Sequence, residues 1–260
     1  FLSLMGDAEL DEGNVWEALG EDSLQHLGRV IWIVDLNRQS LDRVVPTGRA
    51  QKLGASLRSF GFHVIEVKYG SRLESLFAKP GGDRLRARID EMPNSEYQAL
   101  LRTHAPEKIA EQLCRGDQTL AQLIEEEPRE SLHGLVADLG GHDLAKLLAA
   151  FQEADRITDR PVAIIAYTVK GWSLPIAGDP TNHSRLLTDE QIGTLRTGLG
   201  VPEGEEFAAF PADSAEARRC AEAARHLRLD GAPRKRALTP ASLPESLSLD
   251  YRGAVSTQQA

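Results

Sequence analysis

The chain has 260 residues, of which 41% are hydrophobic, and this composition is typical of a folded globular protein. Its formal net charge of −9 argues against nucleic-acid binding, which depends on clustered Lys and Arg. No apolar run is long enough to cross a bilayer, no signal peptide is visible, and Cys114 and Cys220 lack the spacing of a metal or redox motif. We therefore expect a cytoplasmic protein with reduced thiols.

Two apolar runs near the start of the chain predict buried strands. Residues 1–5 end abruptly at a Gly-Asp turn, and residues 30–34 end at a second polar turn. A helix roughly over residues 13–27 has the length of a crossover between parallel strands. Continuous apolar runs are typical of strands covered on both faces, so we predict an α/β fold with a parallel sheet. One such unit would place Asp7 and Asn37 side by side, although thirty positions separate them.

The residue types at these strand ends indicate a chemistry. The Asp7 carboxylate, the Asn37 amide oxygen and a backbone carbonyl form the oxygen-only ligand set that Mg²⁺ prefers, with phosphates completing the shell. Gly6 permits a sharp turn, and the helix that follows would point its amino end at an anion. The alternative is an acidic loop with an ordinary turn Asp and Asn, and residue types alone leave the two interpretations about equally open.

The middle of the chain continues the alternation of helices and strands. Residues 49–60 predict an amphipathic helix that stops at Gly61, and residues 63–67 predict a strand in which His63 is structural. Beyond a short helix at residues 72–77, a charged segment at residues 83–130 carries no functional signal. Its helical runs cover residues 85–92, 106–114 and 120–127.

A polar turn at residues 140–143 follows, and after the next helix comes the most apolar strand of the chain, at residues 162–166. Asp143 is the expected N-cap of a helix over residues 144–154, and we favour this structural interpretation of the turn over a cofactor contact by His142. Lys170 follows the strand and would place a positive charge beside a phosphate, unless it is an ordinary surface lysine. Further helices are expected at residues 188–197, with a capping box, and 214–227.

Several motifs together resemble one family. The segment GDAELDE, followed after the thirty-residue step by DLNRQSLD, resembles the thiamine-diphosphate motif in the form GDGEMDE and NCNLQRLD. That form is typical of the homodimeric type of pyruvate dehydrogenase, the decarboxylating first component of its complex. The segments FGFHVIEVKYG, LGGHD and AYTVKGW resemble later signatures of the same family. The resemblance covers nearly the whole chain and implies the transketolase-like fold, a parallel sheet with helices on both faces.

The resemblance implies a role for several residues. Asp7 and Asn37 would bind Mg²⁺ through their side chains, and Gln39 would bind it through its backbone carbonyl. The remaining residues would contact the diphosphate or act in catalysis. Gly6, Ala8 and Glu9 would line the diphosphate turn, Lys170 would contact the cofactor, and His183 would lie in a mobile loop and help to present a lipoyl group.

Two residues depart from the family motif. Ala8 stands where the motif has glycine, which requires a negative φ at this position. Asp35 stands where the motif has asparagine and adds a negative charge near the diphosphate. These departures put the strength of cofactor binding in question rather than the fold.

The resemblance also implies a domain organisation and partners. Residues 1–229 would form a diphosphate-binding domain truncated at its front, residues 230–249 a linker, and residues 250–260 the start of a pyrimidine-binding domain. We expect a fragment without turnover on its own, taken from a homodimer that decarboxylates a 2-oxo acid, pyruvate by default. The acyl group would pass to a lipoyl-bearing acyltransferase component. A transketolase-type sugar-phosphate transferase and a non-catalytic subunit of the same fold are the alternatives.

Overall fold

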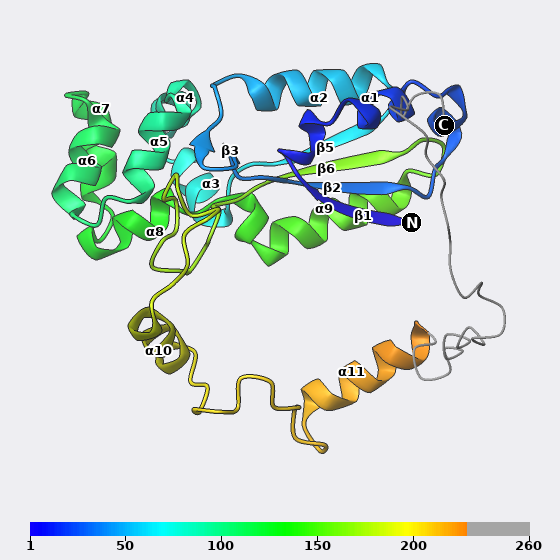
Figure 1. The fold of residues 1–260 in the computed structure, drawn as a ribbon. Helices are drawn as coiled ribbons and strands as arrows, with labels where there is room; N and C mark the ends of the chain where they lie inside the picture. Colours follow the sequence, from blue (N-terminus) through cyan, green and yellow to red (C-terminus); the bar gives the residue numbers. More distant parts are fainter. Residues whose placement is uncertain (228–260) are drawn as a thin grey trace, which may run out of the picture. The chain divides into compact units, whose positions relative to one another are not determined.

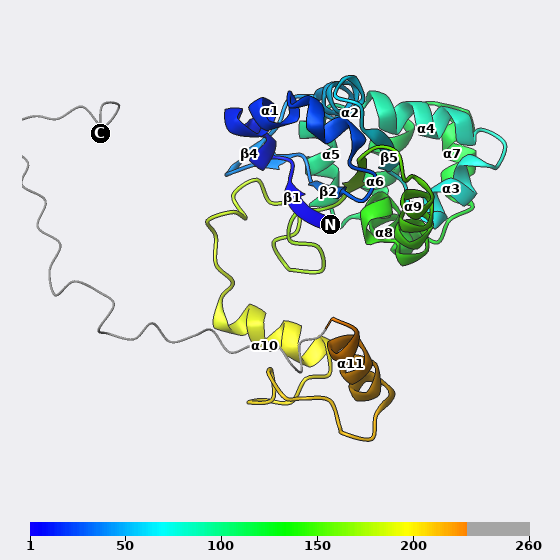
Figure 2. The same ribbon diagram turned by 90° about the vertical axis from the view of Figure 1, so that its right-hand side faces the viewer.

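A computed structural model describes residues 1–227 (Figures 1 and 2). The chain separates into two compact units, Phe1–Leu199 and a second unit that begins at Gly200. The predicted linker at residues 230–249 and the predicted domain start at residues 250–260 lie outside the described residues. None of the helices in the described part is long and apolar enough to cross a membrane.

Four parallel strands form the sheet at the centre of the first unit. They lie in the order β1-β2-β6-β5 and comprise Leu2–Gly6 (β1), Ile31–Leu36 (β2), His63–Val67 (β5) and Val162–Tyr167 (β6). Every residue of β6 is buried, as expected for a strand with neighbours on both sides and helices on both faces. The predicted α/β fold with a parallel sheet is confirmed.

Strand β1 departs from the sequence expectation. The apolar run at residues 1–5 predicts a strand covered on both faces, but Leu2 and Leu4 are 54% and 69% exposed. This prediction is wrong because β1 is an edge strand of the described sheet and pairs only with β2. Apolar content therefore identified a strand here without indicating its position in the sheet.

Helices cover the two faces of the sheet. Helix α2 (Arg49–Ser59) lies over one face and α9 (Leu144–Arg156) over the other (Figure 1). On the α9 face, Ala150 and Ala154 pack against Val162 and Ile164 of β6. On the α2 face, Leu53 and Leu57 join the larger core. This arrangement confirms the predicted layers.

The first crossover is shorter than the sequence predicts. Helix α1 spans Gly13–Leu19, with Gly20 as its C-cap, and a separate 3₁₀ turn follows at Asp22–His26. The single helix expected over residues 13–27 is therefore wrong in length. Glycine has a low helix propensity, and the break falls at this residue.

A group of short helices lies at the carboxyl end of the strands (Figure 1). Four of its helices were expected, whereas α5 and α8 were not. The group comprises α3 (Ser71–Phe77), α4 (Gly82–Glu91), α5 (Asn94–Leu101), α6 (Pro106–Cys114), α7 (Gln118–Glu125) and α8 (Leu132–Val136). Its apolar faces are continuous with the main core, in which Leu85, Leu100 and Ile109 are fully buried.

The remaining elements are short or belong to the end of the described chain. Helix α10 (Asp189–Gly198) begins with the predicted capping box of Thr188 and Gln191, and α11 (Ala215–His226) belongs to the second unit. The small elements are the antiparallel pair β3 (Gln39–Ser40) and β4 (Arg43–Val44) and the 3₁₀ turns Glu9–Asp11, Arg129–Ser131 and Gly140–His142.

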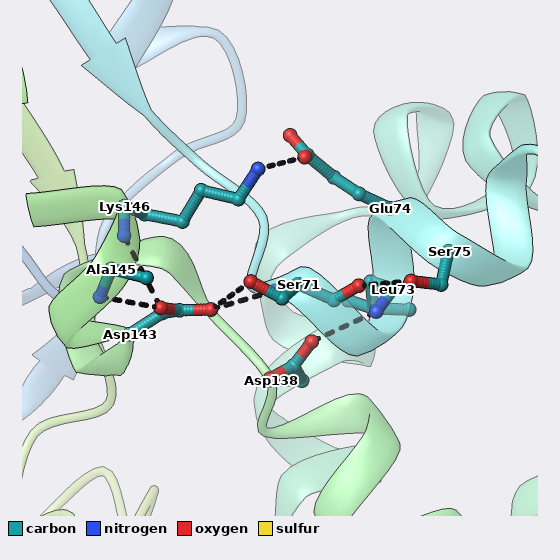
Figure 3. Close-up of polar contacts among 8 residues, drawn as sticks. All are labelled: Ser71, Leu73, Glu74, Ser75, Asp138, Asp143, Ala145 and Lys146. Atoms are coloured by element: carbon teal, nitrogen blue, oxygen red, sulfur yellow. Dashed lines mark hydrogen bonds and ion pairs between the residues drawn. The ribbon is translucent and has the colours of Figure 1, made fainter. Parts of the chain in front are cut away.

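Asp143 is the predicted N-cap of α9, and it also holds the start of α3 (Figure 3). Its Oδ1 accepts hydrogen bonds from the backbone amides of Ala145 (2.9 Å) and Lys146 (3.2 Å). Its Oδ2 accepts from the amide of Ser71 at 2.8 Å and from the Ser71 hydroxyl at 2.5 Å. These hydrogen bonds, led by the one from the Ser71 side chain, lower the pKa of Asp143 to about 2. One carboxylate thus joins the amino ends of two helices.

We expect Asp143→Ala to lower the free energy of unfolding by about 1–2 kcal/mol at pH 7, because amide donors at two helix starts lose their acceptor. A lowered folded-state pKa stabilises the fold above the ordinary aspartate pKa, and this stabilisation is lost as the pH falls from about 4 towards 2. Urea unfolding at pH 7 and at pH 3 measures both effects.

Asp143→Asn is the matched variant, since it keeps an acceptor oxygen but does not titrate. It should be less sensitive than the natural chain to a fall from pH 5 to pH 3. An equal loss of stability in both proteins over this range would contradict the assignment.

Candidate functional site

The register of the sheet brings three strand ends together. Gly6 pairs with Asp35, and Asp35 pairs with Ala166 on the other side. Beyond the last paired residues, the Asp7 amide donates to the Asp35 carbonyl at 3.0 Å, and the Thr168 amide donates to the Leu36 carbonyl at 3.1 Å. The expected juxtaposition of the turns after the first two strands is therefore confirmed.

Asp7 lies at the centre of this arrangement. It is only 3% exposed, and its Oδ1 is buried with no hydrogen-bond partner among the described residues. Burial raises the pKa of Asp7 to about 6, and the Asp35 carboxylate adds to the rise, whereas the Arg49 charge and the backbone amides of Asp7 and Arg38 oppose it. Desolvation therefore outweighs the positive charge of Arg49 and makes the ionised form of Asp7 costly.

Asn37 and Gln39 form a tight turn after β2. The Gln39 amide donates to Asn37 Oδ1 at 3.0 Å, and Gln98 Nε2 of α5 donates to the Asn37 carbonyl at 3.2 Å. Gln39 is buried, and its Nε2 donates to Gln98 Oε1 (3.4 Å) and to the Asp179 carbonyl (3.3 Å). These contacts hold the turn in one conformation.

Backbone strain marks the same turn. Arg38 and Leu41 have φ values of 65° and 54°, in the left-handed region that side chains disfavour. Such residues cost on the order of 1 kcal/mol each and persist where the surrounding contacts hold them. Their concentration between Asn37 and Leu41 is consistent with a binding role for the turn.

The turn after β1 agrees with the sequence expectations for Ala8 and for the start of the next helix. Ala8 has a φ of −76°, so alanine fits where the family motif has glycine. The Gly6 amide donates to Glu9 Oε1 at 3.0 Å. A 3₁₀ turn at Glu9–Asp11 follows, and helix α1 begins only at Gly13. The helix start expected at about Gly13 is confirmed, and the acidic segment before it forms its own turn.

Lys170 and His183 lie in contact beside these turns. Lys170 Nζ donates to His183 Nδ1 at 3.1 Å and to the Leu41 carbonyl at 3.5 Å. The next residue, Ser184, donates from its hydroxyl to Asp42 at 2.6 Å, and this hydrogen bond lowers the pKa of Asp42. The loop after β6 is thus attached to the loop after β2, and the two residues assigned from the resemblance are adjacent.

Asp35 and His142 have structural partners. Thr168 donates its hydroxyl to the Asp35 carboxylate. His142 Nε2 accepts from the Val169 amide at 2.8 Å, and its ring stacks on Trp172 with 4.5 Å between the ring centroids. Burial lowers the pKa of His142, so the neutral ring that accepts this hydrogen bond is favoured. These contacts support the structural interpretation of the LGGHD turn.

The oxygens at these strand ends are of the kind that a hard divalent cation prefers. The buried Asp7 oxygen has no donor, the Asn37 side chain offers an amide oxygen, and a cation there would offset the raised pKa of Asp7. No group of three or more His, Cys, Asp or Glu side chains among residues 1–227 could hold a metal. A site here would therefore depend on amide and carbonyl oxygens as well as on one carboxylate.

Sequence reasoning missed residues that shape this region. Arg38 is buried beside Tyr97, and Gln98 holds the Asn37 turn from the helical segment that carried no functional signal. Arg38 occupies the leucine position of the NCNLQRLD motif, which was a visible signal. Gln98 gave none, because its role depends on where α5 packs.

We expect Asp7→Asn to stabilise the chain at pH 7 in the presence of EDTA by on the order of 2 kcal/mol. The folded-state pKa of Asp7 is raised, so its charge destabilises the fold progressively as the pH rises from about 4 through about 6. The gain in stability of Asp7→Asn over the natural chain should therefore vanish near pH 4. Urea unfolding across this range measures it.

Asp42→Asn provides the control, because this exposed carboxylate has a lowered pKa and should give a pH trend of the opposite sign. A stability difference between Asp7→Asn and the natural chain that is the same at pH 4 and pH 7 would contradict a raised pKa at Asp7.

Comparison with known proteins identifies distant relatives. The chain is 28% identical over 209 residues to the pyruvate dehydrogenase E1 component of Corynebacterium glutamicum, with 78% of this chain and 22% of that protein covered. It is 28% identical over 233 residues to the same component of Escherichia coli K12, with 82% and 25% covered. No family model matches the sequence. The chain thus spans about a quarter of the length of these relatives.

The fold has counterparts among solved structures. A transketolase from Pichia stipitis in complex with xylulose 5-phosphate superposes with a TM-score of 0.51 at 19% identity, covering 88% of this chain and 24% of that one. A variant of the same transketolase gives a TM-score of 0.52 at 18% identity. The first comparison supports distant homology to pyruvate dehydrogenase E1 components, and the second shows a transketolase-like fold.

Proposed function

We propose that this chain is the Mg²⁺- and diphosphate-binding part of a thiamine-diphosphate-dependent 2-oxo acid dehydrogenase, with pyruvate as the default substrate. The observation that carries the proposal is the buried Asp7 oxygen without a donor, placed beside the Asn37 turn by the register of β1 and β2. Distant homology to pyruvate dehydrogenase E1 components supports the same assignment.

Three residues hold the metal in this proposal. Asp7 supplies the carboxylate oxygen, Asn37 its amide oxygen, and Gln39 its backbone carbonyl. Gln98 orients this turn through its hydrogen bond to the Asn37 carbonyl and its contact with the Gln39 side chain. Because Asp7 is buried, its charge is little screened and favours a cation strongly.

Lys170 provides the positive charge for the diphosphate. Its Nζ lies near the turn after β2, as its contact with the Leu41 carbonyl shows. Gly6, Ala8 and Glu9 form the facing turn, in which Glu9 must leave the Gly6 amide before that amide can donate to a phosphate oxygen.

Bound thiamine diphosphate supplies the electron sink for decarboxylation of a 2-oxo acid. The residues of this chain bind and orient that cofactor. His183 accepts a hydrogen bond from Lys170 at Nδ1, which leaves Nε2 as the protonated nitrogen of the neutral ring. In the proposed role, this Nε2–H is the donor that a lipoyl group meets.

The complete protein would act as a cytoplasmic homodimer that transfers its acyl group to a lipoyl-bearing acyltransferase component. The distant homology to E1 components of pyruvate dehydrogenase supports partners of this kind. We also propose that this chain is inactive on its own, because it spans only about a quarter of the length of its relatives.

A second candidate is a non-catalytic subunit with the same fold. Asp35 adds a negative charge that raises the pKa of Asp7, and Glu9 occupies the Gly6 amide. Both carboxylates oppose a diphosphate. A transketolase-type sugar-phosphate transferase is the third candidate, and the fold match to transketolase favours it no more than the dehydrogenase.

Calorimetric titration with thiamine diphosphate tests the site on a protein that carries this chain with its flanking gene sequence. We expect binding that requires Mg²⁺ and that weakens at least tenfold in Asp7→Ala and Asn37→Ala, because each variant removes a metal ligand. Lys170→Met should also weaken binding about tenfold through the lost charge. Lys108→Met, at an exposed lysine of α6, is the charge-matched control.

If thiamine diphosphate binds with equal affinity in the presence of Mg²⁺ and in the presence of EDTA, the proposed metal site is wrong. No binding under either condition would favour the non-catalytic subunit.

The reaction is tested by release of carbon dioxide from pyruvate, 2-oxobutyrate and 3-methyl-2-oxobutanoate with an artificial electron acceptor. We expect release from one oxo acid that depends on both Mg²⁺ and thiamine diphosphate, because the two together form the proposed site. Xylulose 5-phosphate is the comparison substrate. Turnover of this sugar phosphate without release of carbon dioxide from any oxo acid would move the protein to the transketolase type.

A further inference from the structure

A small cavity lies behind the Asn37–Asp42 turn. It has a volume of about 40 Å³ and is enclosed by the carboxyl end of the sheet, the start of α2 and the α4–α5 region. Its lining is unusually polar for a space within the core. The charged and aromatic side chains that line it include Arg38, Arg49, Lys68, Asp90, Tyr97 and Tyr167.

Arg38 is the least compensated charge of this lining. The residue is 8% exposed, and its guanidinium carbon lies 4.0 Å above the centre of the Tyr97 ring. Its Nε and Nη2 atoms are buried and have no hydrogen-bond partner among the described residues. A buried guanidinium with two unmet donors is costly, so a ligand that accepts from both nitrogens would be favoured.

The other charges of the lining do not neutralise Arg38. Lys68 forms an ion pair with Asp90, and Arg49 forms one with Asp11. Asp7 also lines the cavity, and the Arg49 charge opposes the rise in the pKa of its carboxyl. Arg38 is therefore the cation of this lining that has neither an ion-pair partner nor an acceptor for Nε and Nη2 among the described residues.

The start of α2 adds backbone donors to the same space. This helix has 11 residues, and Gly48 at its N-cap has a φ of 89° and offers no side chain to cap the first amides. Gly48, Arg49, Ala50 and Gln51 all line the cavity. Free amides at a helix start together with a guanidinium are the groups that bind oxoanions in proteins.

We propose that this cavity binds one small tetrahedral oxoanion, inorganic phosphate or sulfate, between Arg38 and the amino end of α2. A volume of 40 Å³ holds roughly three water molecules, which suits a single oxoanion but not a larger organophosphate. Arg38 stands at the leucine position of the NCNLQRLD motif, so the guanidinium that defines the proposed site is a departure of this chain from that motif.

The test is the melting temperature of the protein in EDTA as phosphate is added, at constant ionic strength set with chloride. We expect a saturable rise of roughly 5–10 °C when phosphate reaches a hundred times its dissociation constant. Arg38→Leu should abolish the rise. Its melting temperature in chloride should be equal to or above that of the natural chain, since it removes an uncompensated buried charge.

Two variants separate this site from other phosphate effects. Arg102→Leu makes the same change at an exposed arginine and should keep the full rise. Lys170→Met should also keep it, because Lys170 does not line the cavity. Arg38→Lys keeps the charge but loses the guanidinium donors, so we expect it to weaken phosphate binding about tenfold. This variant replaces Arg38→Leu in the test if Arg38→Leu fails to fold.

Several results would overturn the proposal. No saturable rise in the natural chain would mean that the cavity holds only water. A rise that persists in both Arg38 variants, or one that is lost in Lys170→Met instead, would place the anion elsewhere. Titration of the natural chain with phosphate in a calorimeter provides a direct measurement that does not depend on any variant.

Discussion

The in-register pairing of β1, β2 and β6 is the constraint on which the candidate site depends. Parallel strands that pair residue by residue end at one edge, so the turns after Gly6, Leu36 and Tyr167 have to share a small space. Backbone hydrogen bonds continue beyond the strands, from Asp7 to Asp35 and from Thr168 to Leu36. A shift of one residue in either pairing would reverse the side-chain directions and remove Asp7 from the interior.

The electrostatics of this edge follow from burial. The Asp7 carboxylate is enclosed without enough compensating charge, whereas the Arg38 guanidinium is enclosed nearby with two unmet donors. Both side chains line the same small cavity, and no ion pair joins them among the described residues. The region around the strained turn therefore combines a carboxylate that favours a cation with a guanidinium that favours an anion.

Sequence reasoning predicted the parallel sheet, the helices on its two faces, the cap at Asp143 and the meeting of the first two strand ends. These features depend on local signals: apolar runs, turn residues and helix starts. It overestimated the burial of β1, because apolar content does not report whether a strand lies at an edge. It also found no role for residues 83–130, since the contact of Gln98 with the Asn37 turn arises only when α5 packs against the sheet.

The contact of Gln98 with the Asn37 turn constrains the position of Gln98 within α5. Gln98 reaches both Asn37 and Gln39 from one position on α5. Each residue added or removed ahead of it within the helix would rotate its amide by about 100° around the helix axis, away from the turn. Substitutions in these helices are tolerated provided that the positions of their apolar faces stay apolar. The residue count between the start of α5 and Gln98 cannot drift, so insertions and deletions in related chains should fall in the loops between the helices and spare this interval.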